Sequence, residues 1–178
     1  MKDHIVIKLD STTELLQYFT GSVTVTQSTK KYAATSIQAG LAVGDKIYIA
    51  GCGQTASNGL KTIATLGTNE LTVEEAVGTD EGPTASVTLN QEYQGDWKEV
   101  DQFSHLLPTI NCSGNAYIYV DFSGDGVNTD YTNTGTITGG TADMGSIETG
   151  LPFARLRVRN NGADQTTMRA YLYGRRLT

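Results

Sequence analysis

Residues Leu41–Leu89 read LAVGDKIYIAGCGQTASNGLKTIATLGTNELTVEEAVGTDEGPTASVTL. In this stretch Ile47 and Ile49 alternate with Tyr48 and Ala50, and a glycine-rich turn follows before the next short apolar run. Alternation with a period of two is typical of a half-buried β-strand, and clusters of Gly, Asn and Ser mark the turns between strands. The stretch therefore predicts a meander of short strands that forms a small β-barrel or sandwich.

The same pattern extends over the rest of the chain. Ile5, Ile7 and Leu9 share one face of an N-terminal strand, and the run AYIYVDF at 116–122 alternates in the same way. Hydrophobic residues make up 38% and charged residues 18% of the 178 residues, which is too apolar and too patterned for a disordered chain. We therefore expect an all-β protein with three segments, namely a strand or arm at 1–20, a small β-domain at 21–90 and a second β-unit at 91–178.

Within the second β-unit, three features carry specific expectations. Trp97 is the only tryptophan and is expected to anchor a core. The glycine- and threonine-rich segment 124–150 is too long for a plain loop, so a strand is expected at 134–138. Near the C-terminus two apolar-alternating runs, 155–159 and 168–173, flank the sequence Asn160-Asn161-Gly162, which predicts a β-hairpin.

Charge is segregated along the chain. The net charge is −6, yet all six arginines lie within residues 155–178, where the only acidic residue is Asp164, so this segment carries +5. A basic end on an acidic body favours docking against an acidic neighbour or a second copy, although local pairing of the arginines explains the pattern equally well. The overall acidity, with a pI of about 4.8, argues against nucleic-acid binding.

The basic segment also interleaves arginine with tyrosine, a combination enriched at protein interfaces. On the predicted strands these side chains point away from the core. The candidate interface residues are Arg155, Arg157, Arg159, Arg169, Tyr171, Tyr173, Tyr117 and Tyr119.

Two stretches resemble structural proteins of tailed-bacteriophage virions. The sequences GDKIYIAG at 44–51 and NGLKTI at 58–63 are similar to a pattern of small β-domains in these proteins, GD-x-I-x-I-x-G followed by NG-x-x-T-I. The sequence PFARLRVRNNGADQTTMRAYLYGRRL at 152–177 resembles the closing hairpin of jelly-roll-like domains in phage decoration, fibre and tail proteins. This resemblance implies that segment 91–178 is a jelly-roll-like β-sandwich.

The resemblance also implies a function. We expect a non-enzymatic virion component, in particular a capsid-decorating or cement protein that binds the major capsid protein or other virion proteins and forms a homo-oligomer, with a trimer favoured. A tail, baseplate or fibre component and a carbohydrate-binding β-sandwich module remain alternatives. No apolar run reaches the roughly 18 residues that a membrane span requires, and the apolar core of MKDHIVIKLD is too short for a signal peptide.

One segment suggests a metal site. Oxygen-bearing side chains cluster around a DG turn in DFSGDGVNTD, at 121–130, and calcium takes six to eight oxygen ligands. The spacing departs from that of an EF-hand loop, so a plain turn is the alternative. No other cofactor is expected. The candidate calcium ligands are Asp121, Asp125, Asn128 and Asp130.

No segment indicates catalysis. The sequence contains no GxSxG, P-loop, HExxH or GxGxxG motif. Asp101, Ser104 and His105 have the side chains of a hydrolytic triad, but residues so close on one strand do not adopt the geometry of a triad. The two cysteines, Cys52 and Cys112, form no CxxC pair and are expected to be buried thiols.

Overall fold

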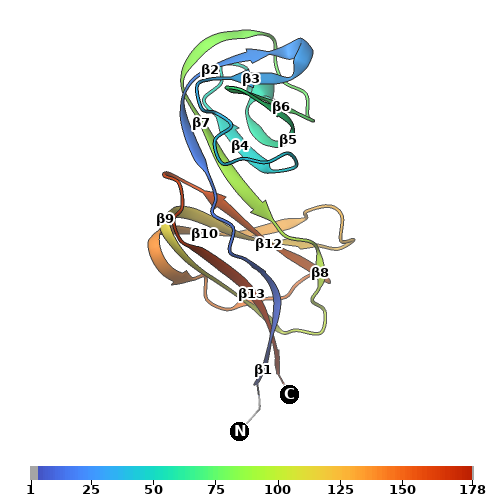
Figure 1. The fold of residues 1–178 in the computed structure, drawn as a ribbon. Coiled ribbons are helices and arrows are strands. Elements are labelled where there is room, and N and C mark those ends of the chain that lie inside the picture. Colours follow the sequence, from blue (N-terminus) through green and yellow to red (C-terminus); the bar gives the residue numbers. More distant parts are fainter. Residues whose placement is uncertain (1–3, 178) are drawn as a thin grey trace. The chain divides into compact units, whose positions relative to one another are not determined.

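The chain folds almost entirely into antiparallel β-strands (Figure 1). The structure is a computed structural model that describes residues 4–177. The predicted all-β fold class is confirmed, since helical structure in the described part is limited to two single turns, Gln27–Thr29 and Thr55–Ser57. The chain divides into two compact units. We call residues 16–92 and 162–164 the barrel unit, and residues 4–15, 93–161 and 165–177 the terminal unit.

The barrel unit is a closed ring of six strands. Each strand pairs antiparallel with the next in the order β2, β3, β6, β5, β4, β7 and back to β2. Closure leaves no free sheet edge between these strands. The strands are β2 (Tyr18–Thr26), β3 (Lys31–Ala33), β4 (Lys46–Ala50), β5 (Gly59–Gly67), β6 (Glu70–Val73) and β7 (Glu81–Gln94).

Alternating side chains fill the barrel, as the sequence pattern predicts. Ile47 and Ile49 of β4 and Val23 of β2 are at most 1% exposed. Each such side chain stabilises the fold by about 1.5–3 kcal/mol relative to exposure. Tyr32 is also fully buried, and its hydroxyl donates a hydrogen bond of 2.6 Å to the carbonyl of Ser57. The barrel interior is therefore a packed core in which the buried hydroxyl of Tyr32 has a hydrogen-bond partner.

The terminal unit is sandwich-like and is organised around β9. One edge of this long strand pairs with β10 and then β11, and the other edge pairs with β13 through 105–112 and with β12 through 116–123. β1 adds to β13, and β8 adds to β12. The strands are β1 (His4–Thr12), β8 (Lys98–Glu99), β9 (His105–Ser123), β10 (Tyr131–Asp143), β11 (Ile147–Glu148), β12 (Phe153–Asn160) and β13 (Met168–Leu177).

β9 and β10 therefore each run through two regions of one continuous sheet. We call the region of β8, β12, the second half of β9 and the first half of β10 the β12 sheet, and the region of β1, β13 and the other halves the β13 sheet. Between the two halves of β9, the buried Gln165 accepts a hydrogen bond of 2.9 Å from the backbone N–H of Gly114. Its amide also donates to the carbonyl of Asn115 at 3.1 Å. Gln165 thus satisfies backbone groups that neither β12 nor β13 can reach.

The predicted C-terminal hairpin is wrong. β12 and β13 alternate as expected, with Leu156, Val158 and Leu172 fully buried, but they do not pair with each other and each of them pairs with a different half of β9. The 19 residues of β9 offer enough edge for both strands in succession. The expected turn is part of a longer crossover, in which Gly162 belongs to the barrel unit. The strand predicted at 134–138 is present within β10.

The N-terminal segment is not a separate arm. β1 pairs with β13 from His4↔Leu177 to Thr12↔Ala170, and residues 16–20 belong to the barrel unit. A register shift between Lys8 and Asp10 interrupts the predicted alternation. The predicted boundary at residue 90 lies close to the observed one, which falls between residues 92 and 93. Residues 1–3 of the predicted arm and the side chain of Ile5 lie outside the described part of the chain.

Candidate interaction surface

The outward side of the β12 sheet gathers most of the predicted interface residues. Because Ala154, Leu156 and Val158 point into the core, the intervening arginines point outward. Register with β9 then places each arginine opposite an outward side chain of that strand. We call this surface the β12 face, and its cross-strand pairs are Arg155 with Asp121, Arg157 with Tyr119 and Arg159 with Tyr117.

Asp121 is the centre of the β12 face and is only 1% exposed. Arg157 binds both of its carboxylate oxygens, Nε to Oδ2 at 2.7 Å and Nη2 to Oδ1 at 3.0 Å. Arg155 Nε donates to Oδ2 at 2.9 Å, and the Thr132 hydroxyl donates to Oδ1 at 2.8 Å. Burial raises the pKa of Asp121, but the hydrogen bonds and charge of Arg157, with those of Thr132 and Arg155, outweigh it and hold the pKa below its usual value.

The guanidinium groups of the β12 face also lie over aromatic rings. The Arg155 guanidinium lies 4.3 Å from the centroid of the Trp97 ring. The Tyr119 ring lies 4.5 Å from the guanidinium of Arg157 and 5.3 Å from that of Arg159. Such cation–π contacts contribute about 0.5–1 kcal/mol each at exposed sites. Trp97 is intermediate in burial and is not one of the fully buried core residues, so its predicted role as a core anchor is not confirmed.

The β12 face is therefore a rigid, basic and aromatic surface. It carries three arginines, two of which bind the carboxylate of Asp121. The side chains of Arg155 and Arg157 are only 16% and 14% exposed, so packing and ion pairs fix their rotamers. A fixed array of guanidinium groups and ring edges can bind carboxylate-rich protein surfaces at a low entropic cost.

The remaining predicted interface residues lie elsewhere. Arg169, Tyr171 and Tyr173 point outward from β13, on a second surface that we call the β13 face. The two tyrosine rings stack with centroids 5.8 Å apart and an interplanar angle of 25°. The predicted interface residues thus fall into two groups, because β12 and β13 pair with different halves of β9.

The predicted calcium ligands serve other purposes. Asp121 binds arginine, as described above. Asp125 accepts hydrogen bonds from the backbone N–H groups of Asn128 and Val127, both at 2.8 Å, and these bonds lower its pKa. Asp130 accepts from the N–H of Gly124 at 2.8 Å. Across residues 4–177, no group of three or more His, Cys, Asp and Glu side chains is placed to hold a metal ion. The DG segment is therefore a self-capped turn.

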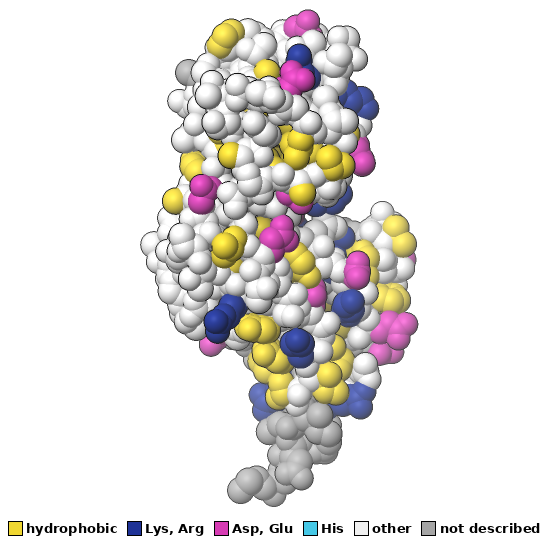
Figure 2. Space-filling model, in the orientation of Figure 1, with side chains coloured by type: hydrophobic (Ala, Val, Ile, Leu, Met, Phe, Trp, Pro, Cys, Tyr) yellow, Lys and Arg dark blue, Asp and Glu magenta, His cyan; other side chains and the backbone are white. Residues whose placement is uncertain are grey.

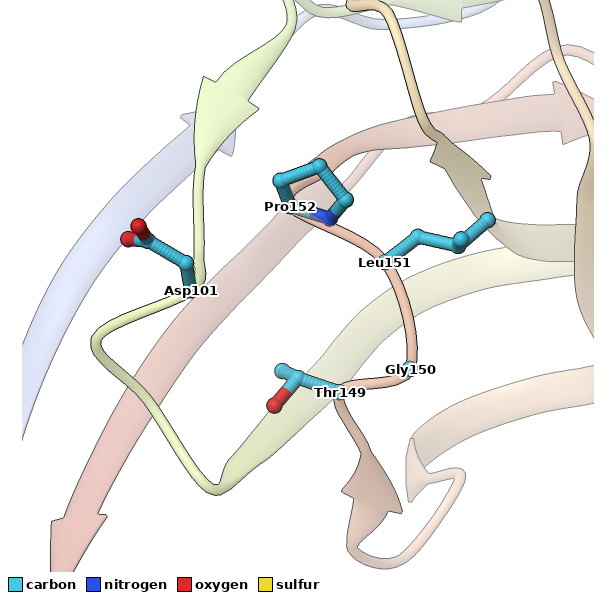
Figure 3. Close-up of a pocket in the computed structure, with 5 residues that line it drawn as sticks. All are labelled: Asp101, Thr149, Gly150, Leu151 and Pro152. Carbon is cyan, nitrogen blue, oxygen red and sulfur yellow. The ribbon is translucent and has the colours of Figure 1, made fainter.

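One hollow of the terminal unit, about 230 Å³ in volume, lies where the β8–β9 and β11–β12 connections meet (Figure 3). Asp101 bounds one side of it, and the loop with Leu151 and Pro152 bounds the other. The Thr149 hydroxyl donates to the backbone carbonyl of Phe103, so it is engaged within the fold. With Asp101 as its one ionisable lining residue, this hollow offers no acid–base pair.

Ser104 and His105 make a contact that the sequence pattern did not predict. Ser104 Oγ lies 3.0 Å from His105 Nδ1 and also donates to the carbonyl of Arg175 at 3.1 Å. No hydrogen bond to Asp101 joins this pair within the described residues. The pair therefore lacks the third member that orients a catalytic histidine.

No protein-family model matches the chain, and no match was found among curated proteins. Among the residues that the structure describes, no helix is long and apolar enough to cross a membrane.

Sequence reasoning did not assign Trp97 and Thr132 to the β12 face, and it gave Asp121 a different role. Thr132 and Asp121 are partners because β10 pairs with β9 in that register. The sequence alone gives little reason to pair Asp121 with arginine, since an acidic residue at an outward position of a strand usually faces solvent. Only the register between the strands shows that Asp121 and Thr132 lie beside the arginines.

Proposed function

We propose that this chain is a non-enzymatic structural protein of a tailed-phage virion, in particular a capsid-decorating or cement protein, and that it docks through the β12 face. The proposal is supported by the resemblance of segments 44–63 and 152–177 to such proteins and by the all-β fold. The observation that carries it is the array of arginines that Asp121, Trp97 and Tyr119 hold in place.

The composition of the β12 face favours a protein partner. Arg, Tyr and Trp are the residue types most enriched at binding hot spots. The ion pairs with Asp121 fix Arg155 and Arg157 before any partner arrives, which lowers the entropy lost on docking. The three arginines favour an acidic surface, such as a carboxylate-rich region of the major capsid protein or of another virion protein. Arg159 pairs across the strands with Tyr117 rather than with Asp121, which makes it the arginine to vary in a test.

We also propose that the chain assembles as a homo-oligomer, with a trimer favoured. β1 is the edge strand of the β13 sheet, and Val6 and Ile7 on this strand are 52% and 40% exposed. Unpaired edges with exposed apolar side chains are natural contact sites between copies. Light scattering on the purified chain should give three times the monomer mass, and a monomer at all concentrations would contradict this part of the proposal.

The docking proposal is tested by co-sedimentation of the full chain with virions that lack it. Arg159→Gln should weaken binding about tenfold, the effect of losing one charge-assisted contact. Arg169→Gln is the matched control, because it removes the same charge from a strand on the β13 face. Binding should also fall as salt is raised, since exposed charges are screened. Absence of the chain from purified particles, or equal binding by both variants, would refute the proposal.

A further inference from the structure

The β13 face carries a tyrosine platform that the docking proposal does not use. The stacked rings of Tyr171 and Tyr173 are partly exposed, and both hydroxyls are without a partner among the residues described. Figure 2 shows basic side chains beside hydrophobic ones, a class that includes tyrosine, over the terminal unit. Tyrosine offers a large rigid surface with a polar tip, which suits ligands that have both C–H and hydroxyl groups.

Two adjoining hollows lie beside this platform. One, of about 230 Å³, is lined by Asn111, Thr141, Arg169 and Tyr171, and the other, of about 290 Å³, is lined by Asp143 and its neighbours. Thr109 of β9 lines both hollows, and we call the surface that carries them the trough. Each hollow lies near the lower end of the size range of small-molecule sites.

The polar groups of the trough are placed for a hydroxylated ligand. Asn111 Nδ2 donates to Thr141 Oγ1 at 2.5 Å, which orients the amide and leaves its oxygen to accept. One oxygen of Asp143 accepts from the N–H of Gly145 at 2.9 Å, and its other oxygen is an acceptor. Planar amide and carboxylate groups beside an aromatic ring can bind the adjacent hydroxyl groups of a sugar while the ring covers its C–H face.

Arg169 favours a negatively charged ligand. Its side chain is exposed on the trough and has no hydrogen-bond or ion-pair partner within the described residues. An arginine without an internal partner is available for bidentate binding of a carboxylate. This contrasts with Arg155 and Arg157 on the β12 face, whose guanidinium groups are bound to Asp121.

We propose that the β13 face binds a carboxylated oligosaccharide, of the sialic acid or uronic acid type. The ligand's sugar ring lies on Tyr171, its hydroxyls bind Asn111 and Asp143, and its carboxylate binds Arg169. Nucleic acid fits the trough less well, because Asp143 lies in it and the chain as a whole carries −6. This site is separate from the β12 face and does not depend on the docking function.

The test is a glycan array that contains sialylated, uronic acid and neutral glycans, probed with the full chain, followed by calorimetry with the best acidic glycan and its carboxyl-reduced form. The acidic form should bind about tenfold more tightly than the reduced form, as one charge-assisted hydrogen-bond pair implies. Arg169→Gln should remove that preference, and Tyr171→Ala should weaken binding to both forms. Arg159→Gln, on the β12 face, should leave glycan binding unchanged.

Several results would overturn this inference. They are the absence of any acidic glycan among the binders, an unchanged preference for the carboxylate in Arg169→Gln, and equal losses in Arg159→Gln and Arg169→Gln. Arg169 is exposed and supports no internal contact, so its variant keeps the test valid even if Tyr171→Ala fails to fold. Virion binding by Arg169→Gln is measured separately, which distinguishes failure of this site from failure of the docking face.

Discussion

Replacement of Asp121 by alanine should destabilise the terminal unit strongly. The carboxylate is 1% exposed and binds two arginines whose side chains are only 14–16% exposed. Its removal takes away the carboxylate that both guanidinium groups share, while the groups stay largely out of water. Breaking a buried ion pair by removing one partner costs about 3–5 kcal/mol, and the upper half of this range is expected because two cations lose the same partner.

Urea denaturation, monitored by tryptophan fluorescence, measures the free energy of unfolding of the terminal unit. Trp97 is the only tryptophan, and it stacks on Arg155 within the β12 face, so its emission reports on this unit. Asp101→Asn is the matched control, because Asp101 is an exposed aspartate of the same unit and has no partner within the described residues. The control should change the free energy of unfolding by less than about 0.5 kcal/mol.

The double variant separates pairing from packing. Arg157→Met in the Asp121→Ala background removes one of the two guanidinium groups that lose this carboxylate, so it should recover part of the lost stability. A loss below about 1 kcal/mol in Asp121→Ala would refute the reasoning, since that is the value of a solvent-screened surface pair. No recovery in the double variant would show that the cost does not come from the lost ion pairs.

Three further predictions follow from other contacts. Gly174→Ala should lower the free energy of unfolding by about 1–3 kcal/mol, because the added Cβ would lie 2.6 Å from the ring of Phe103, and differential scanning calorimetry with Gly150→Ala as the control checks it. Gln165→Ala should cost about 1–3 kcal/mol through the unpaired N–H of Gly114 and should speed hydrogen exchange at the bend of β9. Since the pKa of Asp121 is lower in the folded state, its stabilising effect is complete above its unfolded pKa of about 3.9 and is lost as pH falls through the folded pKa, so wild-type stability should fall more steeply than that of Asp121→Asn below about pH 4.

Alternation predicted which residues point inward far better than it predicted which strands pair. Leu156 and Val158 are buried as expected, and they would be buried equally if β12 paired with β13 or, as observed, with β9. What decides between these arrangements is the length of β9 and the side chain of Gln165 at its bend. The second of these is a long-range feature, since Gln165 lies some fifty residues along the chain from the backbone that it satisfies.

The candidate site shows the same limit. The arginine–tyrosine composition identified five members of the β12 face. It also assigned to the same interface three residues that lie on the β13 face. Asp121 was interpreted as a metal ligand because it precedes a DG turn, whereas the register of β9 with β12 places it between two arginines. A carboxylate is suited to either role, and only the position of its neighbours across the sheet decides which one it takes.

The most direct measurement of the central claim is a cryo-electron microscopy reconstruction of the virion with this chain bound. The account predicts density for the chain on the particle, with the β12 face against an acidic surface and Arg159 within contact distance of a carboxylate of its neighbour. A reconstruction in which the β12 face points to solvent, or a particle that carries no copy of the chain, would contradict it.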